Sequence, residues 1–291
     1  MQMSTGSVND YRYLRQVVLG HSRNVLDPSC DYLFDARLSR LLRNHGMSRV
    51  DELVRALRLH KDAVLERAVA EAMTINETSF FRDHWPFEYL RTDLLSEMIE
   101  RRRAVRTLRF LSAGCSTGQE ALSLAMVLRE YSPQIAHWNI RIEGTDICTE
   151  AVARAREARY HRIEMNRGLP ARMLVRYFTH DGEHWEAKQD IRTMCHFQQA
   201  NLCTTPLPFR NCFDVIFLRN VMLYFAPETR KTILDEMRRL LAPDGVLFLG
   251  SSEQPVDGTL WTTVLAGGTC YYRPKRNERG QGLKLRDYHN S

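Results

Sequence analysis

The sequence predicts an α/β fold in which a small N-terminal helical domain precedes a doubly wound, mostly parallel sheet. The chain has 291 residues, of which 44% are hydrophobic, so it can furnish two cores. Apolar residues recur at helical spacing up to about residue 75. From residue 107 onward, short apolar runs alternate with helical patterns, which indicates parallel strands covered by helices on both faces.

Residues 1–75 are expected to form the helical domain, because their apolar side chains would share one face of each helix. A linker helix is expected over 76–106, with Trp85-Pro86-Phe87 marking a start and three arginines near its end. These arginines suit the negative end of the helix dipole.

Residues 107–273 are expected to form the sheet domain. A polar stretch at about 160–195, with a turn signal at Asp181-Gly182, suits a small inserted antiparallel β subdomain. Residues 274–291 are charged and nearly free of apolar side chains, so we expect a disordered tail. Strands are predicted at 107–112, 139–145, 196–200, 213–219 and 245–250, and helices at 119–131, 149–157 and 227–241.

Composition narrows the possible environments and partners. The seven cysteines are scattered without a C-x-x-C pair, so we expect reduced thiols and no metal site. No apolar stretch approaches the roughly 20 residues that span a bilayer, and the N-terminus lacks the regions of a signal peptide. We therefore expect a cytoplasmic protein without membrane insertion. The net charge of +6 favours an acidic partner but by itself does not distinguish a nucleic acid from an acidic protein surface or a membrane face.

A loop of small residues follows the first predicted strand. It reads Ser112-Ala-Gly-Cys-Ser-Thr-Gly118, and Gly114 and Gly118 would let the backbone approach a ligand closely. The spacing is neither the dinucleotide fingerprint nor a P-loop, and any turn between a strand and a helix favours small residues. Glu120 suits a ligand with an ammonium group; the alternative is a charge that stabilises the first helical turn.

Polar side chains also follow the next two predicted strands. Asp146 comes after the second strand, where a carboxylate can accept both ribose hydroxyls of a nucleoside. The alternative is that it caps the helix beginning near Thr149. Asn201 and Leu202 follow the third strand and offer an amide and an apolar edge to an adenine ring, although asparagine after a strand is most often part of a turn.

Charged and amide side chains interrupt the apolar run at 213–225. Arg219 and Asn220 end the fourth predicted strand, and Tyr224 follows a few residues later. A charge or amide in such a run is costly to bury without a partner. The same holds for Arg82, which follows two phenylalanines. An arginine in this setting suits the clamping of a carboxylate through two parallel hydrogen bonds.

Several sequence blocks together resemble a known family. They are N-E-T-S-F-F-R-D (76–83), S-T-G-Q-E (116–120), G-T-D-I (144–147), R-N-V-M-L-Y-F (219–225) and L-A-P-D-G-V-L-F-L-G-S-S-E (241–253). The chain resembles the CheR family, the S-adenosylmethionine-dependent methyltransferases that esterify glutamates on bacterial chemoreceptors. The resemblance extends from about residue 50 to residue 273.

The resemblance implies contacts with the whole cofactor and with the reaction centre. The methionine part and the reaction centre would meet Asn76, Thr78 and Arg82, and the amino group would meet Glu120. The remaining implied site residues are Gly114 in the loop, Asp146 at the ribose, Asn201 and Leu202 at the adenine, and Arg219, Asn220 and Tyr224 around the methyl group.

The implied reaction is methyl transfer to a glutamate carboxylate, giving a methyl ester and S-adenosylhomocysteine. A glutamate with a pKa of about 4.3 is already ionised at neutral pH, so no general base is required. The protein must align the reacting atoms and hold the acceptor. Arg82 and Tyr224 are the predicted catalytic residues, and no metal is expected.

Receptor contact is expected through a basic helix face. Arg37, Arg40 and Arg43 lie at three-residue spacing and could dock on an acidic helical bundle; the alternative is a solvated surface. Some members of the family bind a pentapeptide at the receptor C-terminus through a glycine-containing turn. Because this chain has only Gly182 in the corresponding stretch, we expect independence of that pentapeptide. We also expect a monomer.

Two other functions stay open from the sequence. One is a methyltransferase for a small molecule or RNA, although the chain lacks the interleaved basic and aromatic clusters of a strand-binding surface, and we expect no nucleic-acid binding. The other is a non-catalytic module that binds S-adenosylmethionine as a signal. Intact Arg82, Glu120 and Tyr224 argue against that second alternative.

Overall fold

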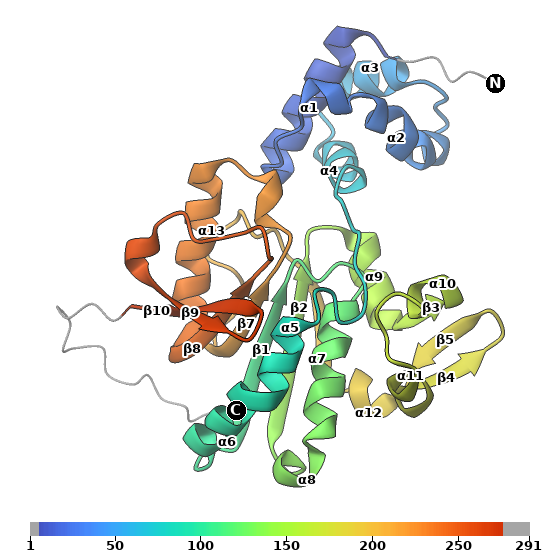
Figure 1. Ribbon diagram of the computed structural model, residues 1–291. Helices are drawn as coiled ribbons and strands as arrows, with labels where there is room; N and C mark the ends of the chain where they lie inside the picture. The colour runs from blue at the N-terminus through green and yellow to red at the C-terminus, as the bar shows by residue number, and fades with distance from the viewer. Residues whose placement is uncertain (1–5, 276–291) are drawn as a thin grey trace.

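The computed structural model describes residues 6–275, in which a helical region (residues 6–75) lies over the carboxyl ends of the strands of an α/β sheet (Figure 1). Its inward side chains, such as Leu14, Phe34, Leu53 and Val69, form a core of their own. Its helices are α1 (Val8–Ser22), α2 (Tyr32–Asn44), α3 (Val50–His60) and α4 (Ala63–Ala72), with a 3₁₀ turn at Pro28–Cys30.

Local sequence explains where two of these helices begin. Ser7 and Asp10 form a capping box at the start of α1, in which each side chain bonds to the other residue's backbone N–H. Asp62 accepts hydrogen bonds from the first N–H groups of α4. Helix α1 ends at Arg23, whose left-handed backbone (φ 60°) turns the chain toward the sheet.

The main sheet has seven strands in the order β6-β2-β1-β7-β8-β10-β9. The first five are parallel, and β10 and β9 continue one edge in antiparallel fashion. The strand order reverses between β1 and β7, and ligands bind at such a switch point. The strands are β1 (Thr107–Ala113), β2 (Asn139–Asp146), β6 (Cys195–Gln199), β7 (Phe213–Leu218), β8 (Leu241–Leu249), β9 (Trp261–Ala266) and β10 (Thr269–Pro274).

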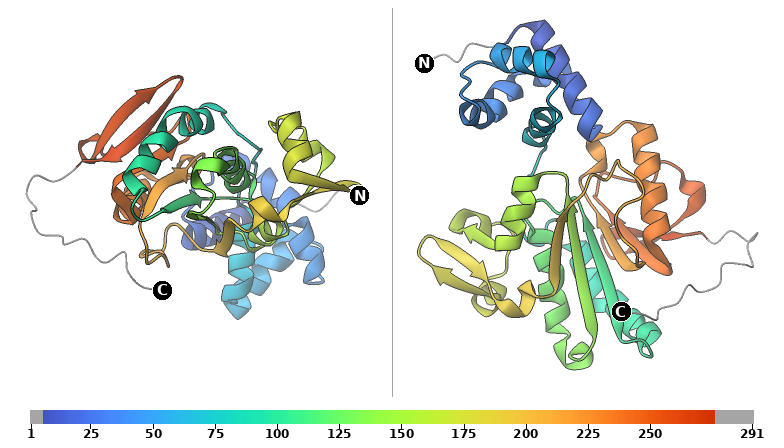
Figure 2. Two further views of the ribbon diagram at one scale, coloured as in Figure 1. Left: turned by 90° about the horizontal axis from the view of Figure 1, so that it is seen from below. Right: turned by 180° about the vertical axis from the view of Figure 1, so that it is seen from behind.

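Helices cover both faces of this sheet (Figure 2). Alternate side chains of a strand enter different cores: Phe110 and Phe217 pack in one, and Leu111 and Ile216 in the other. The first core also contains residues of α5 (Trp85–Tyr89), the π-helical turn Leu90–Leu94, α6 (Leu95–Arg102) and α7 (Gln119–Glu130), and the second contains α13 (Pro227–Leu240). Short α8 (Ser132–Ile135) follows α7, and α9 (Thr149–Glu157) follows β2.

The predicted antiparallel insertion is confirmed as a separate sheet of three strands in the order β3-β5-β4. Gly182 lies in the turn between β4 and β5 with φ 61°, a conformation that favours glycine. The insertion also contains short helices that the sequence did not indicate. Its elements are β3 (Arg159–His161), α10 (Arg162–Met165), α11 (Ala171–Tyr177), β4 (Phe178–Asp181), β5 (His184–Ala187) and α12 (Gln189–Arg192).

The helix predicted over 76–106 is shorter in the structure, where it extends from Trp85 to Arg102. The segment before Trp85 is irregular, because Phe81, Asp83 and His84 adopt positive φ angles of 50°, 60° and 37° that a right-handed helix excludes. The N-E-T-S-F-F-R-D block therefore forms a loop.

No sequence pattern indicated the β9–β10 hairpin, which pairs residues 269–274 with 261–266. The tail predicted from residue 274 begins inside this hairpin, since Pro274 pairs with Trp261, and residues 276–291 lie outside the described part. The domain boundaries stay predictions. Within residues 6–275, no helix is long and apolar enough to cross a membrane.

Candidate active site

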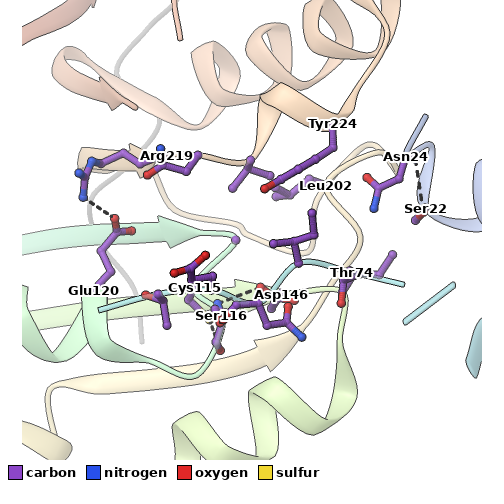
Figure 3. A pocket seen from close by; sticks show the side chains of 18 of the residues that line it. Ser22, Asn24, Thr74, Cys115, Ser116, Glu120, Asp146, Leu202, Arg219 and Tyr224 are labelled. Carbon is purple, nitrogen blue, oxygen red and sulfur yellow. Dashed lines mark hydrogen bonds and ion pairs between the residues drawn. The ribbon is translucent and has the colours of Figure 1, made fainter. Parts of the chain in front are cut away.

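A pocket of about 880 Å³, its open mouth included, lies at the carboxyl ends of β1 and β7 (Figure 3). The pocket brings together every residue that the sequence analysis proposed for the site. These are Asn76, Thr78, Arg82, Gly114, Glu120, Asp146, Asn201, Leu202, Arg219, Asn220 and Tyr224.

The loop after β1 forms the floor of the pocket. Gly114 has φ 78°, and a Cβ added there would lie 2.4 Å from a methyl group of Val221, so only glycine fits. Gly118 is the N-cap of α7, with φ 94°. The backbone N–H groups of Gly114 and Cys115 donate to the Thr145 carbonyl, at 2.8 and 2.9 Å, which fastens the loop to the neighbouring strand.

Asp146 holds the same loop from the end of β2. Its carboxylate accepts hydrogen bonds from the N–H groups of Ser116 (2.8 Å) and Cys148 (2.9 Å). Burial raises the pKa of Asp146, and these two donors oppose the rise. The capping alternative is wrong, because Cys148 is the N-cap of α9 and the Thr149 N–H donates to Glu71 of the helical region at 2.8 Å.

Glu120 and Arg219 form the core of a buried ionic chain at one end of the pocket. One oxygen of Glu120 accepts from Ser112 Oγ (2.7 Å) and the other from Arg219 Nη1 (3.0 Å). Arg219 Nη2 donates to the Asp83 carboxylate (2.8 Å) and to the Arg82 carbonyl (2.7 Å). The partners that a charge in this apolar run requires are therefore Glu120 and Asp83.

The surroundings of Arg219 leave one of its donors free. Its side chain is only 1% exposed, and its guanidinium lies over the rings of Phe87 and Phe217. Among the described residues, its Nε atom has no hydrogen-bond partner. A buried donor without a partner is rare in proteins, and the Nε of Arg273, outside this pocket, is another in the described part of the chain.

Arg82 also faces the pocket, from the irregular segment before α5. The residue is partly buried, and its guanidinium donates to the Glu77 carbonyl at 3.0 Å. Within residues 6–275 it forms no ion pair with a carboxylate, whereas the Glu77 carboxylate binds Arg167 at 2.7 Å. Ser116 Oγ fastens this segment to the glycine loop by donating to the Asn76 carbonyl at 2.8 Å.

Asn220 and Tyr224 enter the pocket from the turn after β7. Asn220 has φ 57°, a left-handed conformation that asparagine tolerates. The turn is held by Glu253, a buried residue to which the sequence analysis assigned no role. Its carboxylate accepts from the N–H groups of Asn220 (2.7 Å), Met222 (2.7 Å) and Gly250 (2.8 Å).

The helical region closes the other end of the pocket. The side-chain amide of Asn201 donates to the His21 carbonyl at the end of α1 (2.8 Å), and its oxygen accepts from the Cys203 N–H (2.9 Å). Leu202 is buried beside it. Ser22 and Asn24, directly after His21, line the pocket as well (Figure 3). The sequence held no local signal for these two, because their part in the site depends on how α1 packs on the sheet.

The strand order, the glycine turn after β1 and the carboxylate after β2 form the arrangement of a nucleoside-binding α/β domain. A family model described as "CheR methyltransferase, SAM binding domain" matches residues 76–268, which makes the class an S-adenosylmethionine-dependent methyltransferase. The chain belongs to the CheR methyltransferase family, as the sequence blocks predicted.

Curated relatives match along most of the chain. "Chemotaxis protein methyltransferase 1" of Pseudomonas aeruginosa is 36% identical over 234 residues, which cover 79% of this chain and 84% of the relative. "Chemotaxis protein methyltransferase Cher2" of Pseudomonas putida is 33% identical over 255 residues, or 86% and 92% of the two chains. "Chemotaxis protein methyltransferase 1" of Vibrio cholerae is 33% identical over 257 residues, or 87% and 92%.

Proposed function

We propose that this protein transfers the methyl group of S-adenosylmethionine to glutamate side chains of chemoreceptors, giving methyl esters. The names of its relatives, chemotaxis protein methyltransferases, support the pathway. An arginine in the pocket supports a carboxylate as the methyl acceptor. Arg82 carries the argument, since it is partly buried at the pocket and pairs with no carboxylate among residues 6–275. A carboxylate is the natural partner of such a guanidinium.

We propose that the cofactor lies along the pocket. We place the methionine end at Glu120, whose carboxylate would meet its amino group, and leave the Arg82 guanidinium to the carboxylate of the acceptor glutamate. The ribose hydroxyls would donate to Asp146, and the adenine would lie against Leu202. Bound in this way, S-adenosylmethionine supplies a methyl group on a positively charged sulfur. Burial of Asp146 makes its hydrogen bonds strong, because water does not compete for them.

The residues around the proposed methyl position can orient the acceptor without taking a proton from it. A glutamate carboxylate is ionised at neutral pH and attacks as it is. The Tyr224 side chain points into the pocket and can donate its hydroxyl proton in a hydrogen bond to one acceptor oxygen (Figure 3). The buried ionic chain of Arg219 keeps the wall of the pocket rigid while the acceptor enters.

The decisive experiment uses S-adenosylmethionine labelled in its methyl group and a cytoplasmic fragment of a chemoreceptor. We expect label on the fragment that alkali releases as methanol, and none on a fragment whose methylatable glutamates are changed to alanine. Label that survives alkali, or that remains on the alanine fragment, would contradict carboxylate methylation and point to a different acceptor.

We propose that the receptor docks on the exposed face of α2. Arg37 takes no part in this, because it is partly buried and donates to the carbonyls of Met73 (3.0 Å) and Thr74 (3.2 Å) at the end of α4. Arg40 is 66% exposed and pairs with Glu150 of α9. Arg43 is exposed and makes no side-chain contact with a carboxylate in the described part of the chain.

Charge reversal tests this surface. Arg40→Glu with Arg43→Glu should raise KM for the receptor fragment several-fold and leave the affinity for S-adenosylhomocysteine unchanged. The control is Arg103→Glu with Arg106→Glu, which reverses the same charge at the amino ends of the strands. Equal effects of the two double variants would reject α2 as the docking face.

We also propose that docking does not require a receptor C-terminal pentapeptide. The inserted sheet offers short strands, β4 and β5, and its turn has one glycine, Gly182, at positive φ. Such a turn has little freedom to open as an edge for an added strand. Methylation should therefore be equal for receptor fragments with and without that tail. Tight binding of the free pentapeptide, together with loss of methylation on its removal, would overturn this.

A further inference from the structure

One polar side chain of the pocket comes from outside the sheet domain. Asn24 follows the left-handed turn at Arg23 that ends α1, and it is only 9% exposed. We propose that Asn24 is a specificity residue of the cofactor site, where its amide reads the edge of the adenine base. This inference rests on the cofactor placement proposed above and assigns a ligand contact to the N-terminal helices.

The backbone at this position is held without help from the side chain. Asn24 forms an isolated antiparallel bridge with Phe225, and the Val25 N–H donates to the Tyr224 carbonyl at 2.9 Å. The Asn24 N–H donates to Ser22 Oγ at 3.3 Å. The side-chain amide makes no hydrogen bond to any residue of the described chain, and it points toward Leu202 and the interior of the pocket (Figure 3). Backbone contacts thus hold this segment in place, and the side-chain amide of Asn24 faces the pocket without a hydrogen-bond partner in the described chain.

The order of residues along the pocket puts this amide at the base end. In Figure 3, Glu120 and Arg219 lie at one end, Asp146 lies between, and Leu202 and Asn24 lie at the other. A nucleoside whose ribose meets Asp146 and whose methionine end meets Glu120 has its base directed to this last group. In this placement, the order of residues along the pocket leaves the position beside Leu202 and Asn24 for the adenine base.

The chemistry of an amide matches adenine in particular. Adenine has an amino donor beside a ring-nitrogen acceptor, and an asparagine side chain carries the complementary acceptor and donor. Asn201 has one N–H and one oxygen lone pair left after its contacts with the His21 carbonyl and the Cys203 N–H, whereas the Asn24 amide has no such contact within the described chain. Leu202 supplies the apolar surface for the ring and leaves the polar edge to Asn24. A buried amide left without a partner would otherwise weaken this part of the site.

Calorimetry with two ligands tests the proposal. One ligand is S-adenosylhomocysteine, and the other is S-inosylhomocysteine, in which an oxygen replaces the amino group of the base. Wild-type protein should prefer the adenosyl ligand, and Asn24→Ala should lower that preference by about tenfold, the typical worth of one buried hydrogen bond. The control is Val25→Ala, one residue along on an exposed side chain, which should keep both affinities.

Each outcome decides between distinct conclusions. Loss of preference in Asn24→Ala alone supports the proposal. An equal fall for both ligands, or no change for either, means that Asn24 is only part of the pocket wall and overturns it. Wild-type protein that binds neither ligand overturns the cofactor placement as well. If Asn24→Ala does not fold, Asn24→Leu has a similar volume and no amide, and the same loss of preference is expected from it.

Discussion

Two arginines at opposite ends of the sheet each bind two carboxylates, and only one of them leaves a donor for a ligand. Arg102, at the amino ends of β7 and β8, uses Nε on Asp214 (2.7 Å) and both Nη atoms on Asp244 (2.9 and 2.6 Å). Arg219, at the carboxyl end of β7, binds Glu120 and Asp83, but its buried Nε has no partner among the described residues. We propose that the closed cluster serves the fold and that the open one serves the site.

The ion pairs of Arg102 also change the pKa values of the groups in this cluster. Its hydrogen bonds lower the pKa of Asp244 and raise its own. Burial raises the pKa of Asp214, although Arg102 and the Arg109 N–H (2.8 Å) oppose this. The pKa values of the two carboxyl groups shift in opposite directions, because Asp214 is nearly excluded from water and Asp244 is 28% exposed. With its pKa lowered, Asp244 contributes stability above its unfolded pKa, and this contribution disappears as pH falls.

The largest effect is expected at the open cluster. Arg219→Met should lower kcat/KM for receptor methylation by about 10²–10³-fold, because it removes a buried cation next to the proposed methionine end and leaves Glu120 without its ion-pair partner. Initial rates with labelled S-adenosylmethionine measure this. Arg102→Met is the matched control, and its rate per folded molecule should stay near that of the wild type. Similar rates in the two variants would contradict the proposal that Arg219 serves the site and Arg102 the fold.

The next effect is on stability. Arg102→Met should lower the free energy of unfolding by about 2–4 kcal/mol, because Asp214 loses its ion pair and Asp244 keeps the longer contact with Arg101 (3.7 Å). Urea denaturation measures the change. The loss should shrink in acid, where Asp214 and Asp244 become protonated in the variant. A variant as stable as the wild type at neutral pH would show that this cluster does not hold the sheet together.

Removing the negative charge of Asp146 tests whether this carboxylate binds the cofactor. Asp146→Asn should weaken S-adenosylhomocysteine binding by about 1–3 kcal/mol, since an amide is a poorer acceptor for two hydroxyls. The carboxyl form of Asp146 binds less well, so affinity should fall as pH drops through its pKa, which burial raises above the usual aspartate range. Calorimetry at several pH values should show that step in wild-type protein and not in Asp146→Asn. An identical pH profile in both would assign the step to another group.

The smallest change concerns one hydroxyl. Tyr224→Phe should reduce kcat about tenfold and leave the affinity for S-adenosylhomocysteine unchanged, because the backbone contact of Tyr224 with Val25 does not involve the side chain. Turnover and calorimetry on the same preparation separate the two quantities. A parallel fall in both would make Tyr224 a binding residue.

The features that the sequence predicted correctly depend on patterns within short segments of the chain. Strands β1, β2 and β7 have long apolar runs that end in Gly114, Asp146 and Arg219, and parallel strands bring those ends to one edge of the sheet. The resemblance to the family supplied the roles of residues in the loop at 76–84, which no periodicity indicates. Asn76, Thr78 and Arg82 of this loop line the pocket, although the helical conformation predicted for the loop was wrong.

The parts that were missed depend on packing between distant segments. Glu71 binds Thr149, and Asn24 meets Phe225, only because the helical region lies against the carboxyl ends of the strands. Glu253 holds the turn at Asn220 across 33 residues of sequence. A charged residue after a strand has many possible partners, and the sequence does not say which one the fold brings near.

Thermal unfolding with and without saturating S-adenosylhomocysteine tests the contrast between the two ends of the sheet most directly. A ligand that binds the folded state raises Tm by an amount set by its affinity. We predict that Arg102→Met lowers the Tm of the free protein and keeps the full ligand-induced rise, whereas Asp146→Ala largely loses the rise. A rise that disappears in Arg102→Met, or that persists unchanged in Asp146→Ala, would contradict the assignment of one end to the fold and the other to the cofactor.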